Sequence, residues 1–220
     1  MNPILIDLDG TFHDSAAIVK KTFRATLREE MGEDHPEEFF VQFIGPPLID
    51  TFTKLGAADP VEMVRRYRVR YEQRMLDTPI FPGMRELVEE LDAAGVPLAI
   101  ATSKNEKNAR AILEHQGVAQ HFRYIAGDPE DIPGYGKGEV VGAALRELRA
   151  RGVDTSRALM VGDRIHDVEG AGQHGLPTVL VEWGTAPRSE WELAWRHVGT
   201  AAELGEILRD FAEVEQSQSH

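Results

Sequence analysis

Two aspartates separated by one residue follow a short apolar run near the start of the chain. The run leads into Asp7, Leu8, Asp9, Gly10 and Thr11. An apolar run without polar alternation, ended by a turn, predicts a buried parallel strand over residues 4–7, and open α/β sheets bind ligands at the carboxyl ends of such strands. Two carboxylates so close repel each other unless a cation or a shared proton relieves them. The pair therefore indicates a chemical site, with an ordinary turn as the alternative.

Asp163 and Asp167 repeat this arrangement at a second expected strand end. Asp163 follows the apolar run at 159–162, and Asp167 stands at the expected start of a helix, where aspartate is also a common N-cap. A calcium loop that begins at Asp7 is excluded, because its twelfth position is Ile18 and not a bidentate glutamate. Four carboxylates at two strand ends predict a hard-cation site, and oxygen ligands of this kind suit magnesium.

A third strand, expected over 98–102, ends in the hydroxyls of Thr102 and Ser103 and then in Lys104. Lys137 stands at the expected start of another helix. A phosphate-binding P-loop is excluded there, because Gly138 takes the place of the Ser or Thr that follows the lysine of that motif. A lysine at a helix start is usually solvated, so the residues alone leave the role of Lys137 open.

The composition limits the classes of partner. The chain has 220 residues, a net charge of −13 and no cysteine. Nucleic acid and anionic membranes both need positive potential, so neither is expected as a partner. Disulfides and thiolate chemistry are excluded. The chain enters a strand almost at once and has no long apolar run, so we expect no signal peptide, no membrane span and a cytoplasmic protein.

Strands alternate with helices along most of the chain, which predicts an α/β fold: a doubly wound parallel, Rossmann-like sheet. Further strands are expected at 122–126 and 178–181, with helices at 83–94, 106–116, 137–151 and 202–211. Residues 15–79 show only helical periodicity, with breaks near 32–34, 45–47 and 56–60. We therefore expect a catalytic core of residues 1–14 and 81–220 and an inserted helical cap of residues 15–80.

These residues together resemble the four motifs of the haloacid dehalogenase-like hydrolase superfamily, especially its phosphoglycolate-phosphatase-like branch with a helical (C1-type) cap. Residues 7–11 are similar to the first motif, Thr102 to the second, Lys137 to the third, and Asp163 with Asp167 to the fourth. The motifs occur in the same order, and the helical insertion falls between the first and second. The resemblance covers residues 1–211.

The resemblance implies a two-step phosphoryl transfer. Asp7 would attack phosphorus, and Asp9 would protonate the leaving alkoxide and then activate water. Magnesium would be held by Asp7, the backbone carbonyl of Asp9, Asp163 and Asp167. The phosphate oxygens would be held by backbone amides near Asp9 and Gly10 and by the side chains of Thr102, Ser103 and Lys137.

The implied function is a magnesium-dependent phosphatase acting on a small phosphorylated metabolite. The presence of Asp9 argues against a dehalogenase, because the dehalogenase reaction releases no alcohol that needs a proton and dehalogenases lack this second aspartate. A phosphosugar mutase, a 5'-nucleotidase and a non-catalytic phospho-ligand-binding module remain alternatives. Lys104 competes with Lys137 as the phosphate ligand, and His13 and His166 either line the site or only pack.

Substrate choice is expected to depend on the cap, where residues 43–48 are the candidate for a loop that faces the site. Phosphoglycolate, nucleoside monophosphates and sugar phosphates all remain open as substrates. We expect a monomer or a weak homodimer, and a disordered tail over residues 216–220.

Overall fold

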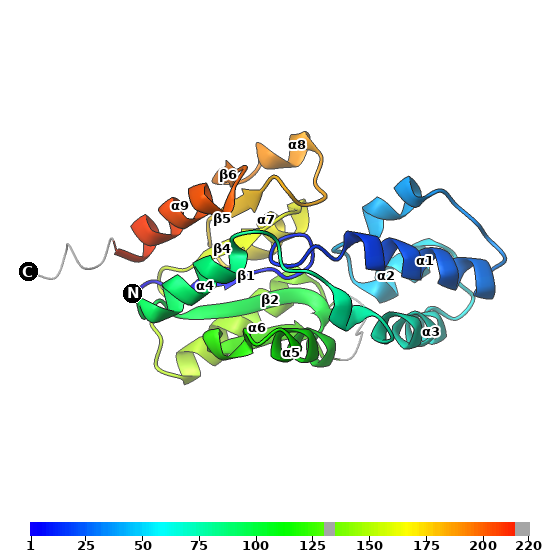
Figure 1. The fold of residues 1–220 in the computed structure, drawn as a ribbon, viewed down its shortest axis with the longest axis horizontal. Coiled ribbons are helices and arrows are strands. Elements are labelled where there is room, and N and C mark those ends of the chain that lie inside the picture. The colour runs from blue at the N-terminus through cyan, green and yellow to red at the C-terminus, as the bar shows by residue number, and fades with distance from the viewer. Residues whose placement is uncertain (130–134, 214–220) are drawn as a thin grey trace, which may run out of the picture.

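A parallel sheet of six strands, in the order β3-β2-β1-β4-β5-β6, forms the centre of the described residues, 1–129 and 135–213, of the computed structural model (Figure 1). The strands are β1 (Ile4–Ile6), β2 (Leu98–Asn105), β3 (Tyr124–Asp128), β4 (Leu159–Gly162), β5 (Thr178–Val181) and β6 (Arg196–Val198). The order runs outward from β1 to β3 in one direction and from β4 to β6 in the other. The predicted doubly wound α/β fold is confirmed.

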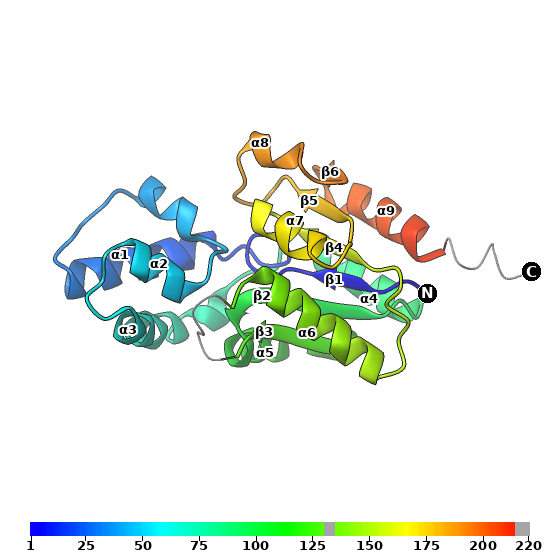
Figure 2. The ribbon, with the colours of Figure 1, turned by 180° about the vertical axis from the view of Figure 1, so that it is seen from behind.

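Helices cover both faces of the sheet, which explains why its central strands are apolar on both sides. Ile4 and Ile6 pack with residues of α4 and α9, whereas Leu5 points to the opposite face and packs with residues of α6. Figure 2 shows α6 and α7 on the near side of the sheet, and Figure 1 shows α4 on the other side. The helices are α4 (Met84–Ala93), α5 (Glu106–His115), η3 (Ala119–His121), α6 (Lys137–Ala150), α7 (Ile165–Gly172), α8 (Arg188–Trp191) and α9 (Ala201–Glu213).

The segment between β1 and α4 forms a helical group to one side of the sheet (Figures 1 and 2). Its apolar cluster centres on Phe23, whose ring centroid lies 4.6 Å from that of Tyr67 and 5.6 Å from that of Phe52. The chain breaks predicted near 32–34, 45–47 and 56–60 separate its helices. These are α1 (Ala16–Glu30), η1 (Glu37–Phe43), α2 (Leu48–Lys54), α3 (Pro60–Glu72) and η2 (Met75–Asp77). The exact division into core and cap stays a prediction.

Several boundaries differ from those expected. β2 continues three residues beyond Thr102, β3 begins two residues later than predicted, and β6 was not expected at all. Positive φ angles occur at the three glycines that follow α4, α5 and α6, as left-handed helix ends require. No helix in residues 1–129 and 135–213 is long and apolar enough to cross a bilayer. The tail at 216–220 lies outside the described residues.

Candidate active site

Asp7 and Asp163 come together because β1 and β4 are neighbouring strands. Ile6 is in register with Val161, and the backbone N–H of Asp7 donates to the carbonyl oxygen of Val161 at 2.8 Å. The strand order reverses between these two strands, and open α/β sheets bind ligands at such a point. Both carboxylates are withdrawn from solvent, with 4% and 1% of each residue exposed.

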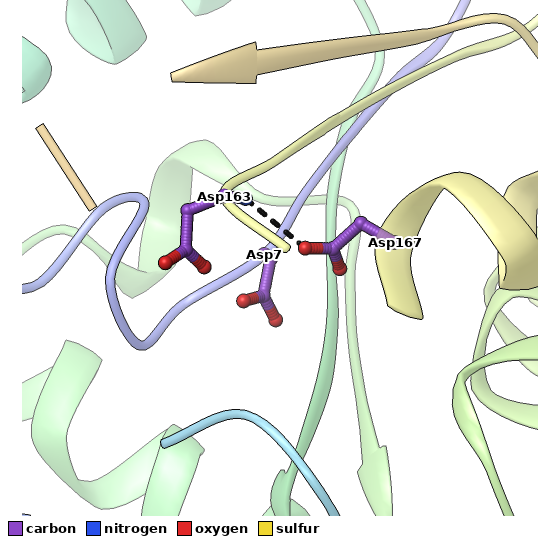
Figure 3. A group of neighbouring side chains, drawn as sticks. All are labelled: Asp7, Asp163 and Asp167. Carbon is purple, nitrogen blue, oxygen red and sulfur yellow. Dashed lines mark hydrogen bonds between the residues drawn. The ribbon is translucent and has the colours of Figure 1, made fainter. Parts of the chain in front are cut away.

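Asp167 reaches the same point from the first turn of α7. Its Oδ2 accepts hydrogen bonds from the backbone N–H groups of Asp163 and Arg164, each at 3.0 Å, which satisfies donors left free at the helix start. Its Oδ1 lies 2.8 Å from Nζ of Lys137. Ligand oxygens of Asp7, Asp163 and Asp167 all lie within 4.8 Å of one another (Figure 3). Asp167 therefore caps its helix with one oxygen and presents the other to the cluster.

Glycines and Thr185 fix the position of Asp163. The backbone N–H and the hydroxyl of Thr185 donate to Oδ2 of Asp163 at 2.9 and 3.1 Å. A Cβ atom at either Gly10 or Gly184 would lie 2.7 Å from Cγ of Asp163, closer than real Cβ atoms approach. Gly10 also has φ +83°, a conformation that favours glycine. The carboxylate therefore sits in a space that only glycine neighbours leave open.

Lys137, the first residue of α6, lies between two of the three carboxylates. Its Nζ is 2.6 Å from Oδ1 of Asp7 and donates to the carbonyl oxygen of Ala101 at 3.0 Å. Burial disfavours the ammonium, but the charges of Asp167 and Asp7 outweigh burial and raise the pKa of Lys137. Lys137 is therefore a permanently charged member of this cluster.

One lysine does not neutralise three buried carboxylates. Burial, opposed by Lys137 and reinforced by Asp167, raises the pKa of Asp7 to about 7. Burial, followed by the charges of Asp167 and Asp7, raises the pKa of Asp163 to about 8. A divalent cation would relieve this excess of negative charge, and clustered carboxylate oxygens are the ligands that magnesium prefers. The residues present therefore fit a magnesium ion.

The side chain of Asp9 turns away from this cluster to a second lysine. Its Oδ2 lies 2.9 Å from Nζ of Lys104, and that ammonium also donates to the hydroxyl of Tyr71 at 2.7 Å. Burial alone would raise the pKa of Asp9, but the charge of Lys104, together with hydrogen bonds from Ser15 and Lys104, outweighs burial and the pKa is lowered. The two lysines thus divide the site, with Lys137 beside Asp7 and Lys104 beside Asp9.

The expected phosphate ligands lie around the same point, with one difference. Thr102 and Ser103 line a cavity together with Asp7 and Asp9, and Oγ1 of Thr102 accepts a hydrogen bond from the backbone N–H of Lys104 at 3.2 Å. The backbone N–H of Gly10, expected to face phosphate, donates to the carbonyl oxygen of His13 at 2.9 Å. Gly10 contributes to the site because the absence of a Cβ atom leaves room for the carboxylate of Asp163.

The helical group closes this cavity to about 60 Å³. Phe43, Ile44, Gly45, Pro46 and Leu48 all line it, so most of the loop expected to face the site does so. From α3, the lining residues are Tyr67, Arg68 and Tyr71, which no sequence motif marked. These side chains reach the cavity only because the helical group packs on the sheet, and a local sequence motif does not record such packing.

Arg164 joins the catalytic edge of the sheet to the helical group, and its role was also not predicted. Its Nη1 donates to the carbonyl oxygen of Ile44 at 3.0 Å, and its Nε donates to Glu190 at 3.1 Å. Glu190 in turn accepts a hydrogen bond from the backbone N–H of Ile165 at 2.7 Å. Arg164 also lines a wider cavity of about 580 Å³, which His166 and Lys137 share.

The two histidines differ in their surroundings. His13 is fully buried; its Nε2 lies 2.5 Å from Oε1 of Gln116, whose amide donates to the carbonyl oxygen of Thr78 at 2.6 Å. Burial lowers the pKa of His13 to about 4, so its ring is neutral near pH 7. The side chain of His166 is 43% exposed and lines the wider cavity.

Comparison with known proteins gives one family and relatives with different printed activities. The family model of haloacid dehalogenase-like hydrolases matches residues 4–181. The tyrosine-protein kinase PtkA of Mycobacterium tuberculosis is 41% identical over 184 residues, which are 82% of this chain and 62% of the kinase. A 5'-nucleotidase of Pseudomonas aeruginosa is 33% identical, with 85% of each chain covered. The chain thus spans less than two thirds of the kinase but most of the nucleotidase.

Among solved structures, a predicted phosphatase from Clostridium acetobutylicum superposes with a TM-score of 0.86 at 28% identity, covering 95% of this chain and 98% of that one. The agreement extends over the sheet and the helical group together, because nearly the whole of both chains is included.

Proposed function

The chain belongs to the haloacid dehalogenase-like hydrolase family of enzymes, and we propose that it is a magnesium-dependent phosphatase of small phosphomonoesters. The convergence of three buried carboxylates and Lys137 at the switch point of the sheet supports this proposal most directly. The 5'-nucleotidase and the predicted phosphatase among the similar proteins agree with it.

Asp7 is the proposed nucleophile. One of its oxygens forms a bond to phosphorus while the bond from phosphorus to the leaving oxygen breaks, which gives an aspartyl-phosphate. Lys137, 2.6 Å from Asp7, would keep the attacking carboxylate oriented and bind a phosphate oxygen. Thr102 and Ser103, which line a cavity with Asp7 and Asp9, are placed to bind the other phosphate oxygens.

Asp9 is the proposed acid and base. It gives a proton to the leaving alkoxide in the first step and takes one from the attacking water in the second, which returns Asp7 as a carboxylate and releases phosphate. Asp163, Asp167, Asp7 and the backbone carbonyl of Asp9 would hold magnesium. Bound there, the ion would offset the repulsion between carboxylate and phosphate.

Metal-dependent phosphate release tests this proposal. We expect the protein to hydrolyse p-nitrophenyl phosphate and members of a metabolite panel with magnesium, and not with excess EDTA. Asp7→Asn is expected to abolish turnover without unfolding the protein. Asp14→Asn makes the same chemical change at an exposed aspartate of the same segment, and full activity is expected there. Activity of Asp7→Asn equal to that of Asp14→Asn would remove Asp7 as the nucleophile.

The panel also separates the alternatives of substrate and acceptor. Nucleoside monophosphates deserve a place in it because of the similarity to a 5'-nucleotidase, beside phosphoglycolate and sugar phosphates. Isomerised sugar phosphate in place of free phosphate would identify a mutase. Absence of any metal-dependent phosphate release would favour a non-catalytic phospho-ligand-binding module.

Protein-tyrosine phosphorylation is a second candidate, favoured by the 41% identity to a tyrosine-protein kinase. In this candidate a nucleoside triphosphate donates the phosphoryl group and a tyrosine hydroxyl takes the place of water. Incubation with γ-labelled ATP and a tyrosine-containing protein substrate distinguishes the two. Labelled phosphotyrosine that depends on Asp7 supports the kinase, and labelled inorganic phosphate alone supports the phosphatase.

A further inference from the structure

A second large hollow lies at the amino ends of the strands, on the side of the sheet away from the candidate active site. It has a volume of about 630 Å³, and its lining includes residues that directly precede β4 and β5 as well as the first residue of β6. These positions are amino ends of strands, whereas the carboxylate cluster lies at carboxyl ends. Figures 1 and 2 show the end of α9, which also contributes to this hollow, far from the helical group that closes the active site.

Three arginines from different elements line the hollow. Arg149 comes from α6, Arg157 from the loop before β4, and Arg196 from β6. Within the described part of the chain none of them has a carboxylate within ion-pair distance, and Asp210 is the one acidic residue of the lining. The lining therefore carries three guanidinium groups and one carboxylate, although the whole protein has a net charge of −13.

Several arginines elsewhere on the surface are held in ion pairs. Arg164 is paired with Glu190 at 3.1 Å, and Arg209 with Glu90 at 2.8 Å. In the hollow, Nε of Arg149 donates to the hydroxyl of Thr155 at 2.5 Å, which leaves its terminal nitrogens without a partner among the described residues. Unpaired guanidinium groups that face one space can bind phosphate oxygens in pairs.

Aromatic rings accompany two of these arginines. The guanidinium carbon of Arg196 lies 4.8 Å from the ring centroid of Trp195, and that of Arg157 lies 6.0 Å from the ring centroid of Phe211. These contacts orient the guanidinium planes. Nη1 of Arg196 also donates to the carbonyl oxygen of Trp195 at 3.1 Å, and its other nitrogens have no partner among the described residues. Trp195 is 46% exposed, although its backbone N–H is fixed to the carbonyl oxygen of Thr178 at 3.0 Å. An exposed indole on a fixed backbone offers a flat surface for stacking.

We propose that this hollow binds a nucleotide, with its phosphates on Arg149, Arg157 and Arg196 and its base against Trp195. The volume lies in the range of small-molecule sites. A hollow of this volume fits a small phosphorylated molecule better than a nucleic acid, which the overall charge of −13 would repel. This site is separate from the carboxylate cluster and does not depend on the proposed phosphatase activity.

Calorimetric titration with ATP in magnesium-free buffer with EDTA tests the proposal. We use protein carrying Asp7→Asn, so that no turnover depletes the probe. We expect one bound ATP per chain, and a loss of affinity of about tenfold or more in Arg157→Ala and in Arg196→Ala, since each loses charged hydrogen bonds. Arg123→Ala is the matched control. Arg123 is an exposed arginine directly before β3, so it also lies at the amino ends of the strands but does not line the hollow. It should bind ATP like the parent.

Two further arms separate this site from others. Lys137→Ala should leave the affinity for ATP unchanged, and inorganic tripolyphosphate should bind more weakly than ATP because it cannot stack on Trp195. Trp195→Ala should reduce the affinity for ATP more than that for tripolyphosphate, because only ATP loses the stacked base. Thermal unfolding of each variant checks that it is folded.

Several results would overturn the proposal. These are an absence of binding up to about 1 mM ATP, a loss of binding in Lys137→Ala, or equal weakening in Arg123→Ala and Arg157→Ala. Equal affinity for tripolyphosphate and ATP would contradict the nucleotide assignment. Failure of the phosphatase assay would leave this test unaffected.

Discussion

Replacing Gly184 by alanine is expected to damage the active site through Asp163 alone. The new Cβ would lie 2.4 Å from Cβ and from Oδ2 of Asp163, and ordinary contact begins near 3.4 Å, so the side chain must move by about 1 Å. Metal ligation tolerates about 0.2 Å, and a displacement of about 1 Å in an active site can cost about 100-fold in rate. We therefore expect kcat/KM to fall about 100-fold, equal to about 2.7 kcal/mol of transition-state stabilisation.

Steady-state hydrolysis of p-nitrophenyl phosphate over a range of magnesium concentrations measures this loss. The magnesium concentration for half-maximal rate should rise in Gly184→Ala, because Asp163 is a proposed metal ligand. Gly172→Ala is the matched control, since a Cβ there meets no atom within 4 Å among the described residues. Its activity and magnesium dependence should equal those of the parent. An unchanged kcat/KM in folded Gly184→Ala would refute the reasoning that the position of Asp163 is fixed and required.

Three other predictions concern charge and closure. Because the pKa of Asp7 and that of Asp163 are raised to about 7 and 8, their protonated forms stabilise the metal-free fold below about pH 4, and that stability is lost as the pH rises to about 8. Differential scanning calorimetry in EDTA should show this fall in the stability of the protein, and magnesium should stabilise the protein more at pH 8 than at pH 5. A fall in stability of the same size in Asp163→Asn would contradict the assignment. Asp9→Asn should lower turnover of an alkyl phosphate about 100-fold and that of p-nitrophenyl phosphate less, because only a poor leaving group needs the proton. Asp14→Asn should lower neither rate, and equal losses on both substrates in Asp9→Asn would argue against Asp9 as the acid. Arg164→Ala should raise KM more than it lowers kcat, because it releases the helical group, and unchanged constants would show that this contact is incidental.

Much of the sheet could be predicted from the sequence because its central strands are apolar on both faces. The run at 159–162 matches β4 fully, and it stands out because helices cover both sides of it. β6 escaped prediction, since Arg196 and His197 are exposed and only Val198 of this short edge strand is buried. The far end of β2 was missed for a related reason: its last three residues are polar and face the cavity.

The membership of the chain in its hydrolase family was predicted from four motifs and is confirmed. The individual site roles remain predictions, although the structure brings Asp7, Asp163 and Asp167 together. Whether Lys137 or Lys104 stands beside Asp7 could not be read from the sequence, because both follow plausible motifs and the pairing depends on the packing of α6 against the sheet. Tyr71 carries no motif, since its approach to Lys104 depends on the helical group.

The position of the covalent intermediate is the most direct test of the proposed chemistry. A rapid acid quench of the enzyme during turnover, followed by borohydride reduction, converts an aspartyl-phosphate to homoserine, which peptide mass spectrometry locates in the sequence. We predict homoserine at position 7 and nowhere else, and none in protein quenched without substrate. Homoserine at position 9, 163 or 167, or an unmodified peptide during active turnover, would contradict the assignment of Asp7 as the nucleophile.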